Sequence, residues 1–199
     1  MAWLKGCLAV YWLSLAVWLA ALMAAGLSAV HTFGKLPGIP LVLEPFAAYP
    51  VEEHGRIAAG LVMADIFVTV DFIQFVAIPL ALIMLALQLT VFRLPAGRPS
   101  NVVRVGCLVL AAGLFSWYAV AVAPPLNGNL RTYWDAARIG DLETAALHRD
   151  LVGAYHSTAR LVLQLNLALV LGAVTASAIA LGPSPTRPRG LPEPELLKR

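Results

Sequence analysis

Charged and amide side chains, the residue types that can bind ligands or transfer protons, occur inside two long apolar stretches of the sequence, where such groups are energetically costly. Three lie in the second stretch and three in the fourth: Asp65, Asp71, Gln74, His156, Arg160 and Gln164. A hydrocarbon environment tolerates such groups only when they pair, face a wet cavity or bind something. The five residues other than His156 are therefore our candidates for ligand or ion binding.

Helical spacing decides which of these groups can face each other. His156, Arg160 and Gln164 are four residues apart and share one helix face. Asp71 and Gln74 also share a face. Asp65 precedes Asp71 by six residues, which places it about 120° away around the helix at about 100° per residue. We therefore expect Asp71 to face the fourth stretch and Asp65 to be solvated.

Two interpretations of Asp71 and Arg160 stay open. The favoured one is a structural ion pair that links the second and fourth helices, because unpaired charges at this depth are costly. The other is a pair that handles protons or ions.

His31 and His156 are the candidate metal ligands. At similar depth on the first and fourth helices, their imidazoles could ligate a transition metal, or a b-type haem axially. Ordinary hydrogen bonding is favoured, because the sequence has no HxxxH, HxxE or cysteine-rich spacing. His54 and His148 fall in predicted loops, and we expect both to be solvated.

Other chemistries find no support in the sequence. It contains no nucleophile–base signature, glycine-rich phosphate loop or dinucleotide fingerprint. No basic and aromatic face indicates nucleic acid as a partner. A non-enzymatic role is therefore favoured.

The elements that position these groups are transmembrane helices. Of the 199 residues, 60% are hydrophobic and 13% are charged, about half the charged fraction of a typical soluble domain. Mean hydropathy is +0.79. Lipid requires backbone polar groups to be satisfied internally, which selects helices over open strands. The sequence predicts an all-α, four-transmembrane-helix bundle over residues 1–182, with spans at about 7–30, 56–92, 102–123 and 151–181.

Prolines mark several features of these spans. Pro79 lies inside the long second span and is its natural kink. The pair Pro124-Pro125 is expected to end the third span. Asp141 is a plausible N-cap of a helix over 141–150 that extends the fourth span. The proline-rich segment 183–199 is predicted to be a disordered cytoplasmic tail.

Charge alternates between the connections and predicts the orientation. The 93–104 connection has three arginines and no acid, whereas the loops 31–56 and 124–150 have a slight acidic excess. By the positive-inside rule, both termini are cytoplasmic and the two longer loops lie outside. We therefore predict a multi-pass protein of the bacterial inner membrane. Counted at about 1.5 Å per residue, the candidate groups all fall near its outer mouth.

Three sequence stretches carry a family resemblance. They are the exit of the first span, Thr32 to Pro37, then Ala59 to Phe67, and then Pro124 through Gly140-Asp141 to His156. With these stretches the chain resembles the four-helix bacterial membrane proteins of the transmembrane protein 205-like type, a domain of unknown function. The resemblance covers about residues 8–181 in layout. It implies a four-span membrane protein and little about activity.

Three functions follow as hypotheses. The leading one is small-molecule, ion or metal handling at an outward-facing polar mouth. The second is a haem- or metal-binding redox protein that uses His31 and His156. The third is a structural or interaction subunit, with a second copy of the chain or a membrane complex as its partner besides the lipid bilayer.

Overall fold

The computed structural model describes residues 2–181, and this part of the chain is helical without strands. Five long helices follow one another: α1 (Ala2–Lys35), α2 (His54–Thr90), α3 (Pro99–Trp117), α4 (Ala123–Ile139) and α5 (Leu142–Leu181). The shorter elements are η1 (Leu36–Gly38), η2 (Glu44–Phe46), η3 (Val51–Glu53) and the π-helical turn η4 (Tyr118–Val122). The predicted disordered tail 183–199 lies outside the described residues.

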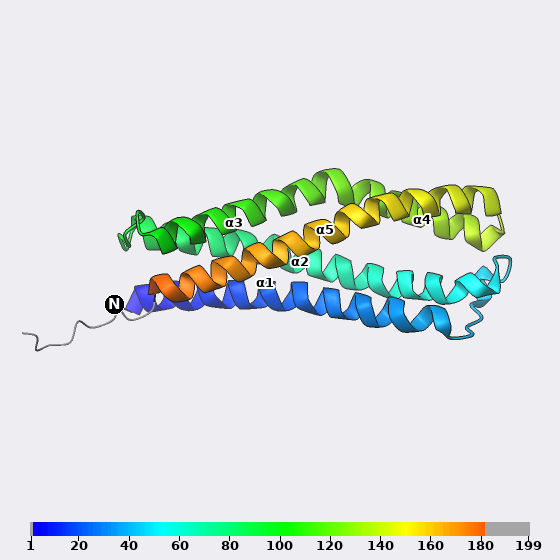
Figure 1. The fold of residues 1–199 in the computed structure, drawn as a ribbon, viewed down its shortest axis with the longest axis horizontal. Coiled ribbons are helices and arrows are strands. Elements are labelled where there is room, and N and C mark those ends of the chain that lie inside the picture. Colours follow the sequence, from blue (N-terminus) through cyan, green and yellow to red (C-terminus); the bar gives the residue numbers. More distant parts are fainter. Residues whose placement is uncertain (1, 182–199) are drawn as a thin grey trace, which may run out of the picture.

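The helices form two long hairpins that lie side by side (Figure 1). In one hairpin α1 packs along α2, and in the other α5 packs along both α3 and α4. The chain start and the turn before α3 lie at one end, called here the terminal end. The loop 36–53 and the turn at Gly140 lie at the other, called the distal end. Each hairpin therefore runs the full length of the molecule.

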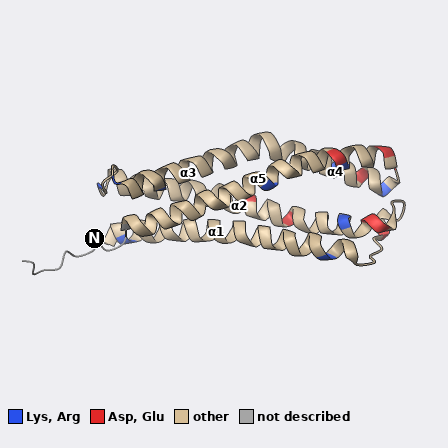
Figure 2. Ribbon diagram, viewed as in Figure 1, with Lys and Arg blue, Asp and Glu red and all other residues tan. Residues whose placement is uncertain are grey.

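Four long helical segments in the described part of the chain are long and apolar enough to cross a membrane. They correspond to α1, α2, the continuous run of α3, η4 and α4, and α5. At about 1.5 Å per residue, the 37 residues of α2 extend well beyond the roughly 30 Å of a hydrocarbon core. Charged residues gather mostly in the distal half, a few lie at the terminal end, and the length of ribbon between the terminal end and the middle is largely without charge (Figure 2). These features fit a transmembrane bundle that projects on the distal side.

The pair Pro124-Pro125 does not end a helix, so that prediction was wrong. The chain passes from α3 through the π-helical turn η4 into α4, and the two prolines stand in the first turn of α4. Proline is tolerated there because the first N–H groups of a helix have no intrahelical acceptor. The expected outer loop 124–150 is therefore α4, a tight turn and the start of α5.

The turn between α4 and α5 follows the predicted capping. Gly140 adopts a left-handed conformation with φ of 73°, which glycine reaches without a side-chain penalty. Asp141 Oδ1 then accepts a hydrogen bond from the Thr144 backbone N–H at 3.1 Å. The predicted N-cap at Asp141 is confirmed, as is the extension of the fourth helix.

Three buried clusters hold the hairpins. The terminal core joins all four long helical segments and comprises Tyr11, Leu15, Trp18, Leu22, Ala77, Ile78, Ala81, Leu85, Leu108, Ala111, Phe115, Val170 and Ala173. The distal cap joins the 36–53 loop to both hairpins and comprises Phe46, Tyr49, Ile57, Tyr133, Ala136, Ala137 and Ala145. A small third cluster, Ala21, Ala25 and Val70, packs α1 on α2. Between the terminal core and the distal cap, the third cluster joins helices of one hairpin and does not join the two hairpins to each other.

His54 anchors the 36–53 loop and is fully buried rather than solvated. Its Nδ1 accepts a hydrogen bond from the Leu43 N–H at 3.0 Å, and its Nε2 lies 2.9 Å from the Phe46 carbonyl oxygen. His148 is also half-buried, 2.8 Å from Asn129 Oδ1. Both predictions of solvated histidines were wrong. The 36–53 loop folds back over His54, and His148 lies on α5 beside Asn129 of α4.

Candidate functional site

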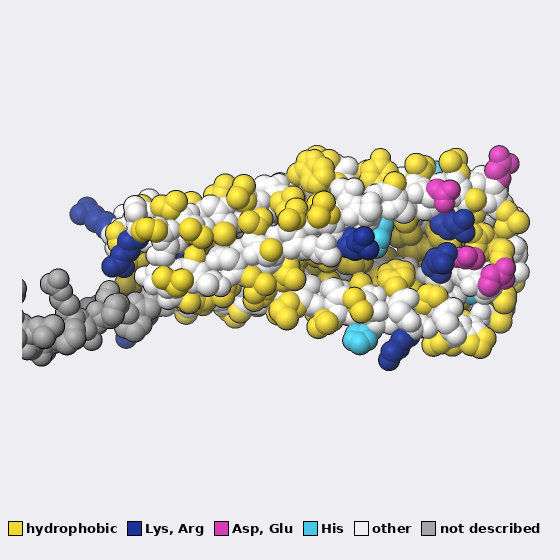
Figure 3. Space-filling model, viewed as in Figure 1, with side chains coloured by type: hydrophobic (Ala, Val, Ile, Leu, Met, Phe, Trp, Pro, Cys, Tyr) yellow, Lys and Arg dark blue, Asp and Glu magenta, His cyan; other side chains and the backbone are white. Residues whose placement is uncertain are grey.

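A cavity of about 570 Å³ lies between the two hairpins in the distal half of the molecule. All four helical segments contribute to it, and its lining on α2 runs from Arg56 to Gln74 and on α5 from Arg149 to Asn166. At about 1.5 Å per residue, the cavity extends roughly 26 Å along the bundle. Figure 3 shows the surface hollowed here, with hydrophobic side chains inside and charged ones around it.

Most of the wall is apolar and aromatic. The contributing side chains include Phe33, Met63, Phe67, Leu126, Leu130 and Trp134. Concave sites with an apolar wall and a few polar groups are typical of ligand-binding cavities. Most of the polar groups here fall into two sets, one around Gln74 and one along α5, and Arg56 and Asn127 lie outside both.

Gln74 is the centre of a hydrogen-bond cluster at the terminal end of the cavity. Its Oε1 accepts one bond from Trp18 Nε1 at 3.1 Å and a second from Asn166 Nδ2 at 3.0 Å. Gln74 is only 3% exposed. This single carboxamide therefore ties α1, α2 and α5 together where the hairpins begin to separate.

Asp71 belongs to the same cluster. One carboxylate oxygen accepts a bond from Gln74 Nε2, and the other accepts one from the Tyr118 hydroxyl, each at 3.4 Å. Tyr118 opens the π-helical turn η4, and such turns are frequent at functional sites. With Trp18, Gln74 and Asn166, these two residues form what we call the Gln74 cluster, which includes a residue from every long helical segment.

The predicted ion pair between Asp71 and Arg160 is not formed. Among residues 2–181, the ion pairs within 4.0 Å join other side chains. Asp71 and Arg160 both line the cavity, but they lie on hairpins that the cavity separates. The carboxylate is bound by neutral donors from Gln74 and Tyr118 instead of by the guanidinium.

Arg160 lies on α5 between His156 and Gln164, the two residues predicted to share its helix face. His156, Arg160 and Gln164 all line the cavity, and the His156 ring packs edge-on against Phe33 with centroids 6.3 Å apart. Arg160 has no acidic partner within 4.0 Å among the described residues. It thus differs from the other two arginines of the lining.

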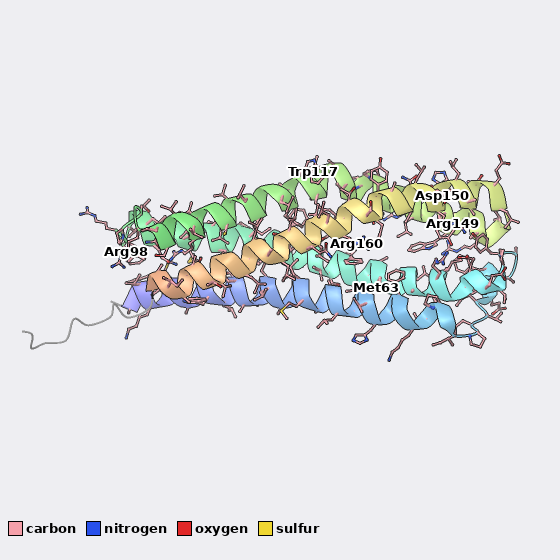
Figure 4. The ribbon with its side chains drawn as sticks, in the orientation of Figure 1. Met63, Arg98, Trp117, Arg149, Asp150 and Arg160 are labelled. Atoms are coloured by element: carbon pink, nitrogen blue, oxygen red, sulfur yellow. The ribbon has the colours of Figure 1, made fainter. Side chains whose placement is uncertain are left out.

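Those two arginines are partly neutralised. Arg56 forms an ion pair with Glu53 at 2.9 Å, and Arg149 lies 3.9 Å from the same carboxylate. Figure 4 shows Arg149 toward the distal end of α5, and Arg160 and Met63 nearer the middle of the molecule. The unpaired cation of the cavity is therefore Arg160.

Asp65 and His31 are not brought to this site. Both are exposed and neither is among the residues that line the cavity, which agrees with the separation of Asp65 from Asp71 around the helix. No group of three or more His, Cys, Asp or Glu residues within 2–181 is arranged to hold a metal. Metal or haem binding by His31 and His156 stays a prediction, with only His156 at the cavity.

A second polar cluster in the terminal half was not predicted. Arg104, counted in the sequence as a loop charge, is fully buried and donates from Nη2 to Gln88 Oε1. Its guanidinium lies 4.8 Å from the centroid of the Tyr11 ring. The Tyr11 hydroxyl in turn lies 2.7 Å from Ser177 Oγ. This Arg104 cluster also draws on all four long helical segments.

The sequence offered partial signals for the residues that were missed. Asn166 follows Gln164 by two residues, so it lies off the stripe that was used to select candidates. Tyr118 stands before Pro124-Pro125, where a helix end was expected. Charge counting alone cannot tell a buried Arg104 from a solvated one. Comparisons with protein-family models, curated proteins and solved structures give no match for this chain.

Proposed function

We propose that this protein is a multi-pass protein of the bacterial inner membrane that binds a small molecule in the cavity between its hairpins. The supporting observation is the cavity itself, about 570 Å³ in volume, together with the Gln74 cluster at one end of it. Its apolar wall would bury a ligand and its few polar groups would orient it. Binding or transport, rather than catalysis, is the activity we assign to the site.

The charge distribution supports an orientation with both termini in the cytoplasm. The terminal end carries Lys5 and the 93–98 turn with two arginines, whereas the acids gather at the distal end (Figure 2). Basic segments remain on the cytoplasmic side during insertion. With that orientation, the cavity opens on the outer side of the membrane.

Cysteine accessibility tests this arrangement. Gly153, Gly113 and Gly6 are suitable positions because an added Cβ meets nothing within 4 Å at any of them. In a background with Cys7→Ala and Cys107→Ala, Gly153→Cys in the cavity lining should react with a membrane-impermeant thiol reagent added outside. Gly6→Cys should react only after permeabilisation. Gly113→Cys, in the middle of α3, should resist the reagent in both cases.

Labelling of Gly6→Cys from outside would overturn the orientation. An unreactive Gly153→Cys would overturn the open outer cavity.

Occupancy of the cavity is tested separately by native mass spectrometry of the purified protein. Ala159 lines the cavity, so Ala159→Trp should remove a co-purifying small molecule. Ala178→Trp, at an exposed position of the same helix, is the matched control and should retain it. Equal ligand content in both variants, or no ligand in the wild type, would count against the proposed function.

A further inference from the structure

We infer that the ligand of this cavity is an anionic lipid with one acyl chain, an inference that rests on the proposed small-molecule binding. Three properties of the site carry it: its shape, its unpaired cation and the way it opens. Each would select against other classes of small molecule.

The shape fits a single long apolar chain. The cavity is elongated over roughly 26 Å at about 1.5 Å per helical residue, and its volume is about 570 Å³. On the distal side of Arg160, the wall is formed largely by apolar and aromatic groups, among them Met63, Phe67, Leu130 and Trp134. A hydrocarbon chain laid along this wall would be removed from water over most of its length.

The charge fits an anionic headgroup near Arg160. This guanidinium has no acidic partner within 4.0 Å among residues 2–181. Among the described residues, Asp71 is the one acid of the lining, and its two oxygens accept one bond each, from Gln74 and from Tyr118. Arg160 is thus free to bind a carboxylate or phosphate, for which a guanidinium provides two parallel donors.

Polar neighbours can complete the binding of such a headgroup. His156 and Gln164 lie one turn to either side of Arg160 on the same face of α5, and both line the cavity. Both carry N–H groups that can donate to a headgroup oxygen. Apart from Arg56 and Arg149, which form ion pairs with the same glutamate at the distal end, most polar groups of the lining lie toward the middle of the molecule and most of the apolar wall lies beyond them. This is the distribution of an amphiphile.

The opening fits entry from the membrane. Gly26, Ala29 and Val30 of α1 line the cavity opposite His156 and Arg160 of α5, and Figure 3 views the hollow between these helices. Counted from Leu181, Arg160 lies roughly 31 Å along α5, close to the roughly 30 Å thickness of the hydrocarbon layer. A lipid of the outer leaflet would thus meet Arg160 at the level of its own headgroup, and its chain would turn out of the hydrocarbon layer to lie along the distal wall.

Displacement of a quenching lipid tests the inference with the full-length protein in detergent. A dibrominated fatty acid bound along the wall should quench the fluorescence of Trp134. Palmitate and palmitoyl lysophosphatidylglycerol should displace it with affinities at least about tenfold higher than those of palmitic acid methyl ester and palmitoyl lysophosphatidylcholine. Only the first two carry a net negative charge. Acetate, which lacks the chain, should not displace it. The two anionic arms distinguish a carboxylate from a phosphate as the headgroup.

Arg160→Gln should lower the affinity for palmitate about tenfold and leave the affinity for the methyl ester unchanged, since loss of a hydrogen bond to a charged group accounts for a difference of that size. Arg131→Gln is the matched control, because Arg131 is an exposed arginine of α4 outside the cavity lining. It should change neither affinity.

Equal affinity for palmitate and its methyl ester, unaffected by Arg160→Gln, would overturn the anionic headgroup. If acetate displaced the quencher with the same affinity as palmitate, the proposed acyl chain would be wrong. If none of these probes displaced it, the ligand would not be a lipid of this class. In each case the co-purification and cysteine experiments still decide separately whether the cavity binds a small molecule.

Discussion

The terminal half and the cavity-bearing half of the bundle use the same four helical segments in different ways. In the terminal half, the Arg104 cluster is enclosed by the terminal core, and Arg104, Tyr11 and Gln88 are fully buried. In the other half, the Gln74 cluster borders a cavity of about 570 Å³. Each cluster joins all four segments, but the Gln74 cluster borders this cavity whereas the Arg104 cluster lies against the terminal core. The tightly packed core and the cavity thus occupy different lengths of the same helices, and the proposed ligand binding belongs to the second of them.

The largest effect should come from removing the acceptor of the buried arginine. Gln88→Leu leaves the Arg104 guanidinium without its Gln88 hydrogen bond, so we expect the free energy of unfolding to fall by about 3 kcal/mol. Unfolding in mixed micelles, titrated with a denaturing detergent, measures this loss. Adding Arg104→Met should recover most of it, because the uncompensated charge is then gone. A double variant no more stable than Gln88→Leu would mean that Arg104 does not cause the loss.

Truncation of one apolar side chain in each half compares their packing directly. Leu108 lies in the terminal core at 0% exposure, and Met63 lines the cavity at 2% exposure. We expect Leu108→Ala to cost about 3 kcal/mol and Met63→Ala about 1 kcal/mol, because the second change only enlarges an existing space. The same unfolding titration compares the two variants. Equal losses would show that the cavity wall is as tightly packed as the core.

A smaller effect is expected at the Gln74 cluster. Gln74→Leu removes the acceptor shared by Trp18 Nε1 and Asn166 Nδ2, and we expect a loss of about 2 kcal/mol. Gln164→Leu is the control, since Gln164 is exposed in the same cavity and should change stability little. If both substitutions gave the same small loss, the cluster would not be what joins the hairpins.

The smallest effect concerns the cap of α5 at Asp141, at the distal end of the bundle. Hydrogen bonding from the Thr144 side chain, and then from the Thr144 backbone N–H, lowers the pKa of the Asp141 carboxyl below its usual range. Because the folded pKa lies below the unfolded value, the ionised cap stabilises the protein at neutral pH, and this contribution is lost as the pH falls through the folded pKa. Asp141→Asn, which keeps an acceptor oxygen, should therefore have a slightly lower free energy of unfolding than the wild type at neutral pH. In unfolding titrations over a pH series, that difference should shrink in acid, and a difference that grew in acid would contradict this account.

The sequence predicted the long apolar helices and the cap at Asp141, because hydropathy and capping are local properties. It also predicted that His156, Arg160 and Gln164 share a face, since that follows from helical spacing. The Asp71–Arg160 pair was predicted wrongly, because depth along two helices does not tell how far apart their hairpins lie. The role of Asn166 could not be predicted either, as it depends on which helix stands opposite.

The contact between Gly140 and the 36–53 loop limits how the proposed ligand would reach the cavity. A Cβ at Gly140 would lie 3.0 Å from Ala48 Cβ, and the distal cap beside this contact joins the two hairpins a second time. The hairpins are therefore packed together on both sides of the cavity, by the distal cap and by the terminal core. With both ends fixed, entry would not require the hairpins to separate. Exchange would be governed by the width of the gap between the hairpins and by the small side chains of α1 that border it.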